Sequence, residues 1–448
     1  MIDEMDLTTD PIPVLVRKIA VPASIGFFFN TMYNVVDTYF AGFISTEALA
    51  ALSISFPVFF IIIAMGTGIS QGGTALIANA LGEKDSGKAH HVCVQCLSFG
   101  ILFAIGLTIL GFAFAPFLFG VLGATGDYLE LALDYMNVIL AGTVFFVLQS
   151  VLNASLNSQG DTKSYRNMLI AGFFLNCLLD PWFMFGGFGI PALGIRGVAL
   201  ATVFIQILGT VYLFRKLAAT KLWEGPILSE LVPSSSYKEI ARQGIPASLN
   251  MVTVAIGIFV ITFFISQFST EGVAAYGIAT RIEQIVLLPT IGLNIAVLSL
   301  TGQNNGAKKF DRVRETWNST MKYGLVMMAV GGFFIFFLPK PLMTFFTDDP
   351  VVVGHGVDYL RIAAITLCSY VVLFQTVSLL QGLKRPLYAI IIGVYRQIFA
   401  PCLVFYLLAF HLGFQETGIW WGIFLVTWSA AIITFFYGRH TLNRITSG

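Results

Sequence analysis

The chain has 448 residues, and its 25 lysines and arginines nearly balance its 24 aspartates and glutamates. Only 11% of the residues are charged and 56% are hydrophobic, whereas a soluble domain carries about 25% charged residues. This composition excludes a water-soluble protein and predicts one that crosses a membrane many times. A net charge of +1 offers no basic surface for nucleic acid, and five cysteines in so long a chain are not a disulfide framework.

Twelve stretches of the chain are apolar enough to cross a bilayer as helices, which takes about 20 residues each. The first six are predicted at Val14–Ala41, Leu49–Ala78, Val92–Leu118, Leu129–Leu152, Tyr165–Phe185 and Leu193–Phe214. The second six are predicted at Ile245–Phe268, Val273–Leu300, Met321–Leu338, Val357–Leu379, Leu387–Phe410 and Gly418–Tyr437. Lysine and arginine collect in alternate loops, so the positive-inside rule places both termini in the cytoplasm.

Short sequence motifs recur at a shift of half the chain length. Pro22-Ala23-Ser24 recurs as Pro246-Ala247-Ser248, and Asp134-Tyr135 recurs as Asp358-Tyr359. Six spans in each copy keep both halves the same way up in the membrane, which is a parallel repeat. We therefore expect an all-α protein with an N-lobe at 1–217, a cytoplasmic linker at 218–243 and a C-lobe at 244–448, the lobes facing each other across a central cleft.

Acidic residues inside the predicted spans are few, and two of them lie at similar depth in the first half. Asp37 is near the outer end of the first span, and Asp180 is near the outer end of the fifth. One helical turn before them come Tyr33 and Asn176, on the same helix faces, and Thr202 on the sixth span is a third polar candidate. Because an ionised group costs about 2.5–3.5 kcal/mol at mid-bilayer, this pattern predicts a functional carboxylate pair.

Two interpretations of the carboxylate pair remain open at this level. A buried pair surrounded by amide and hydroxyl groups can carry a proton through a cycle, or it can hold Na⁺, and oxygen donors do not decide between these ions. Alternatively, both aspartates lie at the membrane interface and cap helix ends, which Pro181 and the glycine-rich loop after it make plausible.

A second set of charges is predicted near mid-membrane in the other half, with Glu283 on the eighth span and Arg396 on the eleventh. We expect these two to pair and so to lower the cost of burying either, chiefly as a structural brace. Pro22 precedes Asp37 on the first span and removes a helical hydrogen bond, so it is a candidate hinge. An ordinary proline of a membrane helix is the alternative.

Motifs that suggest an enzyme lack the residues that the chemistry needs. Gly82–Ala89 nearly matches a phosphate-binding loop, but it carries alanine where Mg²⁺ needs a hydroxyl, and it follows a membrane helix. His90 and His91 have no acidic or cysteine partners at ligand spacing, so we expect them to be solvated. An intramembrane enzyme would need a histidine or cysteine with partners, and His355 and His411 have none that are evident. We therefore expect no enzyme and no cofactor.

Taken together, these residues resemble the multidrug and toxic compound extrusion (MATE) family of transporters. Most specific are Pro22 with Asp37 and Asn176 with Asp180-Pro181, followed by the Gln159-Gly160 and Gln381-Gly382 loops. The prokaryotic branch that carries its coupling acids in the first lobe is the most similar one. The resemblance implies a V-shaped, outward-facing bundle that exports bulky, often cationic compounds in exchange for a cation.

The resemblance also implies roles for individual residues. Asp37 and Asp180 become the coupling carboxylates, with Tyr33, Asn176 and Thr202 in their network and Na⁺ as an alternative ion for the two acids. The lining of a substrate cavity in the first lobe is implied for four asparagines, namely Asn30, Asn34, Asn153 and Asn157. Another branch has acids in spans 7 and 10, which this sequence lacks apart from Asp358 at an outer edge, so a Na⁺ site in the second lobe is not expected.

The sequence thus predicts a multidrug efflux antiporter that works by alternating access in the inner membrane, with H⁺ preferred to Na⁺. Its expected partners are the lipid bilayer and small-molecule drugs or toxic organic cations, and the expected state is a monomer. The alternative is a lipid-linked oligosaccharide flippase of the same superfamily. A flippase needs a cationic cleft for pyrophosphate, and the only inner basic residues are Arg281, Arg361 and Arg396.

Overall fold

The computed structural model describes residues 5–187, 189, 191–227 and 229–446. Within these residues the regular structure is helical, and no β-strand is present. In this part of the chain, 11 helices are long and apolar enough to cross a membrane, or 12 if one bent pair forms a single span. The prediction of an all-α protein with twelve spans is therefore confirmed.

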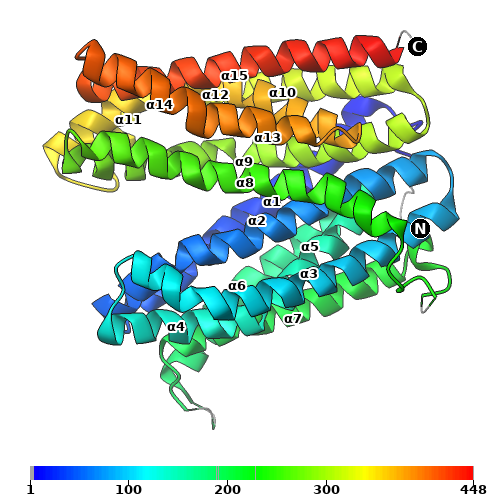
Figure 1. Cartoon of the computed structure of the whole chain (residues 1–448), viewed down its shortest axis with the longest axis horizontal. Helices are drawn as coiled ribbons and strands as arrows, with labels where there is room; N and C mark the ends of the chain where they lie inside the picture. The colour runs from blue at the N-terminus through cyan, green and yellow to red at the C-terminus, as the bar shows by residue number, and fades with distance from the viewer. Residues whose placement is uncertain (1–4, 188, 190, 228, 447–448) are drawn as a thin grey trace. The chain divides into compact units, whose positions relative to one another are not determined.

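The first half of the sequence forms seven α-helices and one short 3₁₀ helix (Figure 1). They are α1 (Ile12–Ala41), α2 (Thr46–Gly82), α3 (Ser86–Val121), α4 (Gly126–Ala141), α5 (Thr143–Ser158), α6 (Lys163–Phe185), α7 (Ile195–Ala218) and η1 (Lys221–Trp223). The second half forms α8 (Ser235–Ser266), α9 (Thr270–Gly306), α10 (Phe310–Phe337), α11 (Pro339–Thr344), α12 (Pro350–Gly382), α13 (Leu387–Val394), α14 (Ala400–Phe405) and α15 (Gln415–Thr446). Two π-helical turns, η2 (Tyr395–Phe399) and η3 (Tyr406–His411), flank α14.

The fourth predicted span is not one straight helix. It consists of α4 and α5, which meet at Gly142 with a bend of 47°. A side chain at Gly142 would overlap Val203 of α7, so the glycine lets α7 pack closely against the bend. The apolar composition of 129–152 gives no sign of this break, because both parts of the span are equally apolar.

The structure repeats between the two halves in the way that the sequence motifs predict. Helices α2 and α9 both have 37 residues, and each begins after a serine whose side chain accepts a hydrogen bond from a backbone N–H of the first turn. These serines are Ser45 and Ser269, which are equivalent in the repeat. Lys84 and Lys308, also equivalent, both adopt the left-handed conformation just after these helices, with φ of 59° and 57°.

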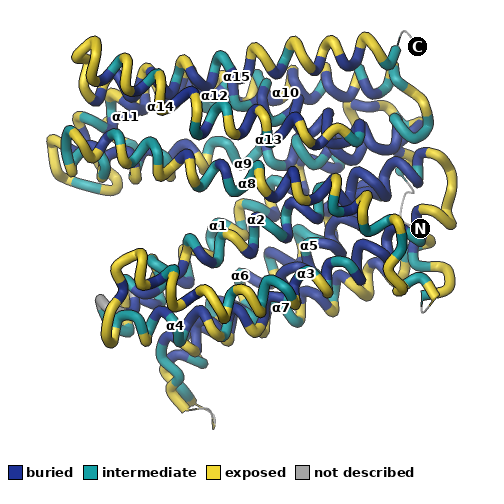
Figure 2. The backbone as a smooth tube through the Cα atoms, viewed as in Figure 1, coloured by how far each residue is buried: buried dark blue, intermediate teal, exposed yellow. Residues whose placement is uncertain are grey.

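Large apolar side chains are exposed on the outer faces of many helices. Phe117, Phe337 and Phe399 have 66%, 64% and 68% of their surface exposed. In Figure 2, exposed positions recur along the helices beside buried ones. So much exposed aromatic surface is expected of helices that face lipid rather than water.

Two compact units make up the chain, one of residues 25–248 and the other of residues 1–24 and 249–448. Both boundaries cut through a helix, α1 after Ser24 and α8 after Ser248. They therefore differ from the predicted boundaries at 217 and 244. The linker and the first turns of α8 pack with the first-half helices, and the first turns of α1 pack with the second-half helices.

The repeated Pro-Ala-Ser motif explains this exchange of helix ends. The Ser24 hydroxyl donates a hydrogen bond to the carbonyl oxygen of Pro289 on α9, at 3.4 Å. The equivalent Ser248 hydroxyl donates to the carbonyl oxygen of Met65 on α2, at 3.1 Å. In both copies the first helix thus packs on the second helix of the other copy.

A glycine makes each of these close contacts possible. A side chain at Gly292 of α9 would overlap the Ala20 carbonyl and the Ser24 hydroxyl, and one at Gly68 of α2 would overlap Ser248. Gly68 and Gly292 are themselves equivalent in the repeat. Two helices can approach to this distance only where one of them carries no side chain.

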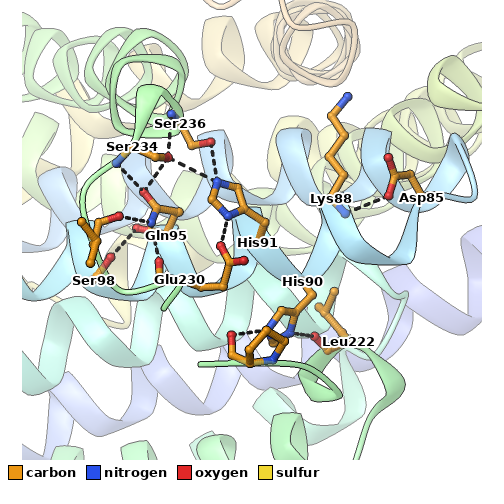
Figure 3. Close-up of polar contacts among 12 residues, drawn as sticks. Asp85, Lys88, His90, His91, Gln95, Ser98, Leu222, Glu230, Ser234 and Ser236 are labelled. Carbon is orange, nitrogen blue, oxygen red and sulfur yellow. Dashed lines mark hydrogen bonds and ion pairs between the residues drawn. The ribbon is translucent and has the colours of Figure 1, made fainter. Parts of the chain in front are cut away.

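The linker is fastened to the start of α3 by a set of hydrogen bonds that Figure 3 shows. The Gln95 side-chain amide donates to the Val232 carbonyl at 2.7 Å and accepts from the Ser234 hydroxyl at 3.0 Å. His91 contacts the Glu230 carboxylate, and His90 lies 3.0 Å from the Leu222 carbonyl. The expectation of a solvated side chain is wrong for His90, which is only 4% exposed beneath the linker, whereas His91 stays partly exposed.

We predict that alanine at Gly68 or Gly292 destabilises the protein strongly. The added methyl group has no space, and such overpacking costs about 1–3 kcal/mol. Alanine at Gly106 or Gly277, where no atom lies within 4 Å of the new methyl group, is the matched control. Thermal unfolding of the four purified variants should show a lower unfolding temperature only for Gly68→Ala and Gly292→Ala. Equal unfolding temperatures of all four variants would contradict the packing argument.

We also predict that Gln95→Ala loosens the linker. Limited digestion with trypsin should cleave near Lys221 several-fold faster in this variant than in the unaltered protein. The control is Lys88→Ala on the same helix, which removes an exposed ion pair with Glu83 and longer-range attractions to Asp85 and Glu239, and exposed pairs contribute about 0–1 kcal/mol. Unchanged cleavage in Gln95→Ala would show that other contacts hold the linker.

Candidate functional site

One amide connects the two aspartates that the sequence singles out. The Asn176 side-chain nitrogen donates hydrogen bonds to Asp37 Oδ1 at 2.8 Å and to Asp180 Oδ1 at 2.9 Å. Asp37 is 7% exposed, and neither Asp180 nor Asn176 has any exposed surface. The structure therefore places these three predicted residues together in the interior of the unit formed by residues 25–248.

The sequences of α1 and α6 bring these groups together. Asn176 and Asp180 are four residues apart on α6, so they share one face of that helix. Gly26 lets α1 approach α6, because its Cβ position is only 3.1 Å from the Arg166 Cα atom. Further along, the rings of Phe29 and Phe173 pack edge to face at a centroid distance of 5.5 Å.

Both aspartates lie within their helices and not at the ends. Helix α1 continues past Asp37 to Ala41, and α6 continues past Asp180 to Phe185. Their position and their burial do not fit the interpretation as helix caps at the membrane interface. Pro181, directly after Asp180, lies inside α6 and cannot donate a hydrogen bond to the carbonyl of Cys177.

Tyr33 and Thr202 lie beside the carboxylate pair, as predicted. Tyr33 packs among Leu179 and Ala201, and Thr202 is 2% exposed on α7. Electrostatic and polar interactions link Tyr33 to both Asp37 and Thr202. The Thr202 hydroxyl is placed to interact with both Tyr33 and Asp37, whereas Asp180 Oδ2 makes no hydrogen bond within the described residues.

Sequence reasoning missed two other residues near the pair. Tyr135 of α4 is 4% exposed and close enough to interact electrostatically with both aspartates. It belongs to the repeated Asp-Tyr motif, so the repeat itself was the signal that could have found it. Gln206, one turn from Thr202 on α7, has a buried side-chain oxygen without a hydrogen bond in the described part of the chain.

The four asparagines predicted to line a substrate cavity fall into two groups. Asn30 and Asn34 of α1 are exposed, and the Asn34 amide donates to the Asn30 carbonyl at 2.9 Å. Asn153 and Asn157 of α5 are buried, with 8% and 5% exposed surface. Among the described residues, none of the four asparagines forms a hydrogen bond with Asp37 or Asp180, so their role in substrate binding stays a prediction.

The predicted pair of Glu283 and Arg396 is not a direct contact. Among the described residues, no nitrogen of Arg396 lies within 4.0 Å of a Glu283 oxygen; instead Tyr359 donates to Glu283 Oε2 at 2.8 Å. Arg396 stacks over the ring of Tyr370, whose centroid is 5.6 Å away. Aromatic side chains thus surround both charges, and Tyr370 interacts with each of them.

Pro22, the predicted hinge, is buried inside an unbroken α1.

The arrangement around Asn176 suits the reversible binding of one small cation. No basic side chain forms an ion pair with Asp37 or Asp180 in the described residues, so two carboxylates share one neutral amide. Two like charges in an apolar interior repel each other and lack the solvation of water. A bound cation removes part of that cost, and its release restores it, so occupancy changes the stability of the local packing.

We predict a strong energetic coupling between Asn176 and Asp37. Asn176→Ala removes two hydrogen bonds to charged groups, each worth about 1.5–3 kcal/mol, and leaves the carboxylates unbridged. Asp37→Asn removes one of the two charges, so the double variant should lose less stability than the sum of the single losses. Denaturation of the unaltered protein and the three variants in detergent measures this coupling, and additive changes in stability would show that Asn176 and Asp37 act independently.

The chain matches the family described as MatE over residues 22–182 and 246–407. Among curated relatives, it is 27% identical to the FAD transporter of Shewanella oneidensis, with 89% of this chain and 88% of the relative covered. It is 28% identical to the probable multidrug resistance protein NorM of Thermotoga maritima, covering 75% and 72%. The multidrug export protein MepA of Staphylococcus haemolyticus is 23% identical, covering 95% and 93%.

Solved structures show the same fold. A multidrug resistance MATE family transporter in an outward-facing conformation superposes with a TM-score of 0.92 at 26% identity, covering 99% of this chain and 98% of that one. A MOP superfamily transporter from Pyrococcus furiosus, described as having a binding pocket of reverse polarity, gives a TM-score of 0.91 at 25% identity, covering 99% of both. The family match in both sequence halves, together with these likenesses, shows that the chain belongs to the MatE family of membrane transporters.

Proposed function

We propose that the protein is a proton-coupled efflux antiporter that exports organic compounds by alternating access. The observation that carries this proposal is the buried carboxylate pair bridged by the Asn176 amide. Acids inside a membrane protein are rare and commonly mark proton or ion pathways. Asp37 and Asp180 are the proposed coupling groups, with Tyr33, Asn176 and Thr202 as their polar surroundings.

The direction of the Asn176 hydrogen bonds favours H⁺ over Na⁺ as the coupling ion. The amide presents its N–H groups to one oxygen of each carboxylate, so positive hydrogens already occupy the space between those two oxygens. A Na⁺ ion needs several oxygen ligands around it and would have to displace this amide. A proton needs only one carboxylate oxygen, and Asp180 Oδ2 is buried with no hydrogen bond in the described residues.

Antiport requires that drug and cation favour different states of the protein. A ligand shifts an equilibrium only by its difference in affinity for the two states. In our proposal, protonation neutralises the pair, α1 repacks against α6 and α7, and the cavity beside them loses its affinity for the drug. Pro22 is the proposed hinge, because it lies close to the point where α1 passes from one compact unit into the other.

The comparisons support the proposed class of transport. Two of the relatives are named multidrug resistance or multidrug export proteins, and similar MATE structures are described in a straight and in a bent conformation. One relative is named a FAD transporter, so exported compounds in a test should include this dinucleotide.

We further propose that the protein is a monomer in the inner membrane, with both termini in the cytoplasm.

Efflux from proteoliposomes tests the proposal. A fluorescent organic cation should leave vesicles several-fold faster when a pH gradient is applied, and a Na⁺ gradient of equal size should have no effect. Asp37→Asn should abolish the acceleration, since the variant can no longer gain or lose a charge at that position. Glu130→Gln, which alters an exposed acid of α4, is the control and should behave as the unaltered protein does.

Three outcomes would argue against the proposal. Acceleration by Na⁺ alone would assign the carboxylate pair to that ion. Efflux that survives in Asp37→Asn would remove Asp37 from the coupling mechanism. No response to either gradient, with any of the tested compounds, would favour the flippase alternative.

A further inference from the structure

The unit formed by residues 1–24 and 249–448 contains a cavity that the proposed coupling mechanism does not use. Its volume is about 200 Å³, and residues of α8, α9, α12, η2, α14 and α15 line it. The walls are mainly apolar and aromatic, with Tyr276, Phe374 and Phe405 among them. Glu283 and Arg396 both line this cavity, so one small space holds two opposite charges.

Two tyrosines, Tyr359 and Tyr370, interact with the negative group. Tyr359 donates to Glu283 Oε2 at 2.8 Å, and Tyr359 is itself packed against Trp420 at a ring-centroid distance of 5.1 Å. Glu283 is 5% exposed, and its Oε1 makes no hydrogen bond in the described part of the chain. A buried carboxylate oxygen without a donor is unfavourable, and a ligand that donates to it would be stabilised there.

The positive group is held by aromatic rings. The Arg396 guanidinium lies 5.6 Å from the ring centroid of Tyr370 and 5.8 Å from that of Phe374. Arg396 also lies in the π-helical turn η2, an irregularity that is frequent at functional sites and costs regular hydrogen bonding. The Arg396 side chain is only partly buried, so its N–H groups can reach a ligand in the cavity.

Glu283 and Arg396 line one cavity but form no direct ion pair in the described residues. A direct ion pair would be the simplest way to lower the cost of burying them, yet none of their nitrogen and oxygen atoms is within 4.0 Å in the described residues. Stacking on Tyr370 and Phe374 holds the arginine, and the Tyr359 hydrogen bond holds the glutamate. The cavity therefore presents a fixed positive group and a fixed negative group to whatever enters it.

We propose that this cavity is a binding site for a small aromatic zwitterion, whose carboxylate contacts Arg396 and whose ammonium group contacts Glu283. A net-neutral ligand with separated charges matches both groups at once, whereas a simple cation or anion leaves one of them unpaired. The volume is below the roughly 300–1,000 Å³ of pockets for drug-sized molecules, so the ligand is compact. Its ring would pack between Tyr276, Tyr370 and Phe374.

This inference goes beyond the proposed antiport and does not rest on it. All the residues that line the cavity belong to one compact unit, whereas Asp37 and Asp180 belong to the other. Binding can be measured without any ion gradient, so a failure of the coupling proposal would leave this test intact.

Calorimetric titration of the full-length protein in lipid nanodiscs tests the site. The probe is para-aminomethylbenzoate, a zwitterion at neutral pH, and its two controls are para-methylbenzylamine and para-methylbenzoate, which each keep one charge. We expect the zwitterion to bind about tenfold more tightly than either control, because each control loses one charge-assisted contact. This comparison needs no altered protein and is therefore independent of folding defects.

Two variants then assign the contacts to side chains. Arg396→Gln should bind the zwitterion no better than para-methylbenzylamine, and Glu283→Gln should bind it no better than para-methylbenzoate. Asp37→Asn should keep the preference of the unaltered protein even though it has lost coupled efflux. Absence of binding, equal binding of all three compounds, or a preference that survives in both cavity variants would overturn the proposal.

Discussion

Two carboxylates held by one amide inside an apolar helix bundle are the constraint on which the account of this protein depends. Asn176 donates to both Asp37 and Asp180, and within the described residues no basic side chain pairs with either. Removing two negative charges from water is costly, so the local structure is sensitive to any cation that joins them. The fold buries Asp37 and Asp180 without a basic partner in the described part of the chain, and the resulting electrostatic cost is what makes the site respond to a cation.

Gene duplication gave both halves the same framework but not the same charges. The repeated Asp-Tyr motif places a tyrosine beside buried acid in each half, Tyr135 near Asp37 and Asp180, and Tyr359 against Glu283. In the described residues of the first half, Asp37 and Asp180 pair with no basic side chain and share the neutral Asn176 amide. In the second half, Arg396 lines the same cavity as the acid. The first arrangement suits the uptake of a cation, and the second suits a ligand that carries both charges.

The sequence was most informative where a pattern repeats or where a membrane makes a residue costly. Span positions follow from apolar length, and the helix starts at Ser45 and Ser269 follow from the repeat. Asp37 and Asp180 could be found because few acids occur inside the spans. The double hydrogen bond of Asn176 could not be predicted in the same way, because it depends on the packing of α1 against α6, which brings Asp37 to Asn176.

Other features depend on three-dimensional contacts that no local pattern reveals. The close packing at the Gly142 bend involves Val203 of α7, which is far away in the sequence. The fastening of the linker by His90 and His91 depends on contacts with Leu222 and Glu230, which lie more than 130 residues further along the chain. Glu283 and Arg396 were expected to pair because both are charged and deep, but the aromatic rings around them decide where each side chain lies.

Proton exchange on drug binding tests the central claim most directly. Purified protein in a weakly buffered detergent solution is mixed with a fluorescent organic cation, and a pH-sensitive dye records protons that leave the protein. The account predicts proton release on binding by the unaltered protein and none by the variant that combines Asp37→Asn with Asp180→Asn. Binding by the unaltered protein without proton release, or the same release from the double variant, would contradict it.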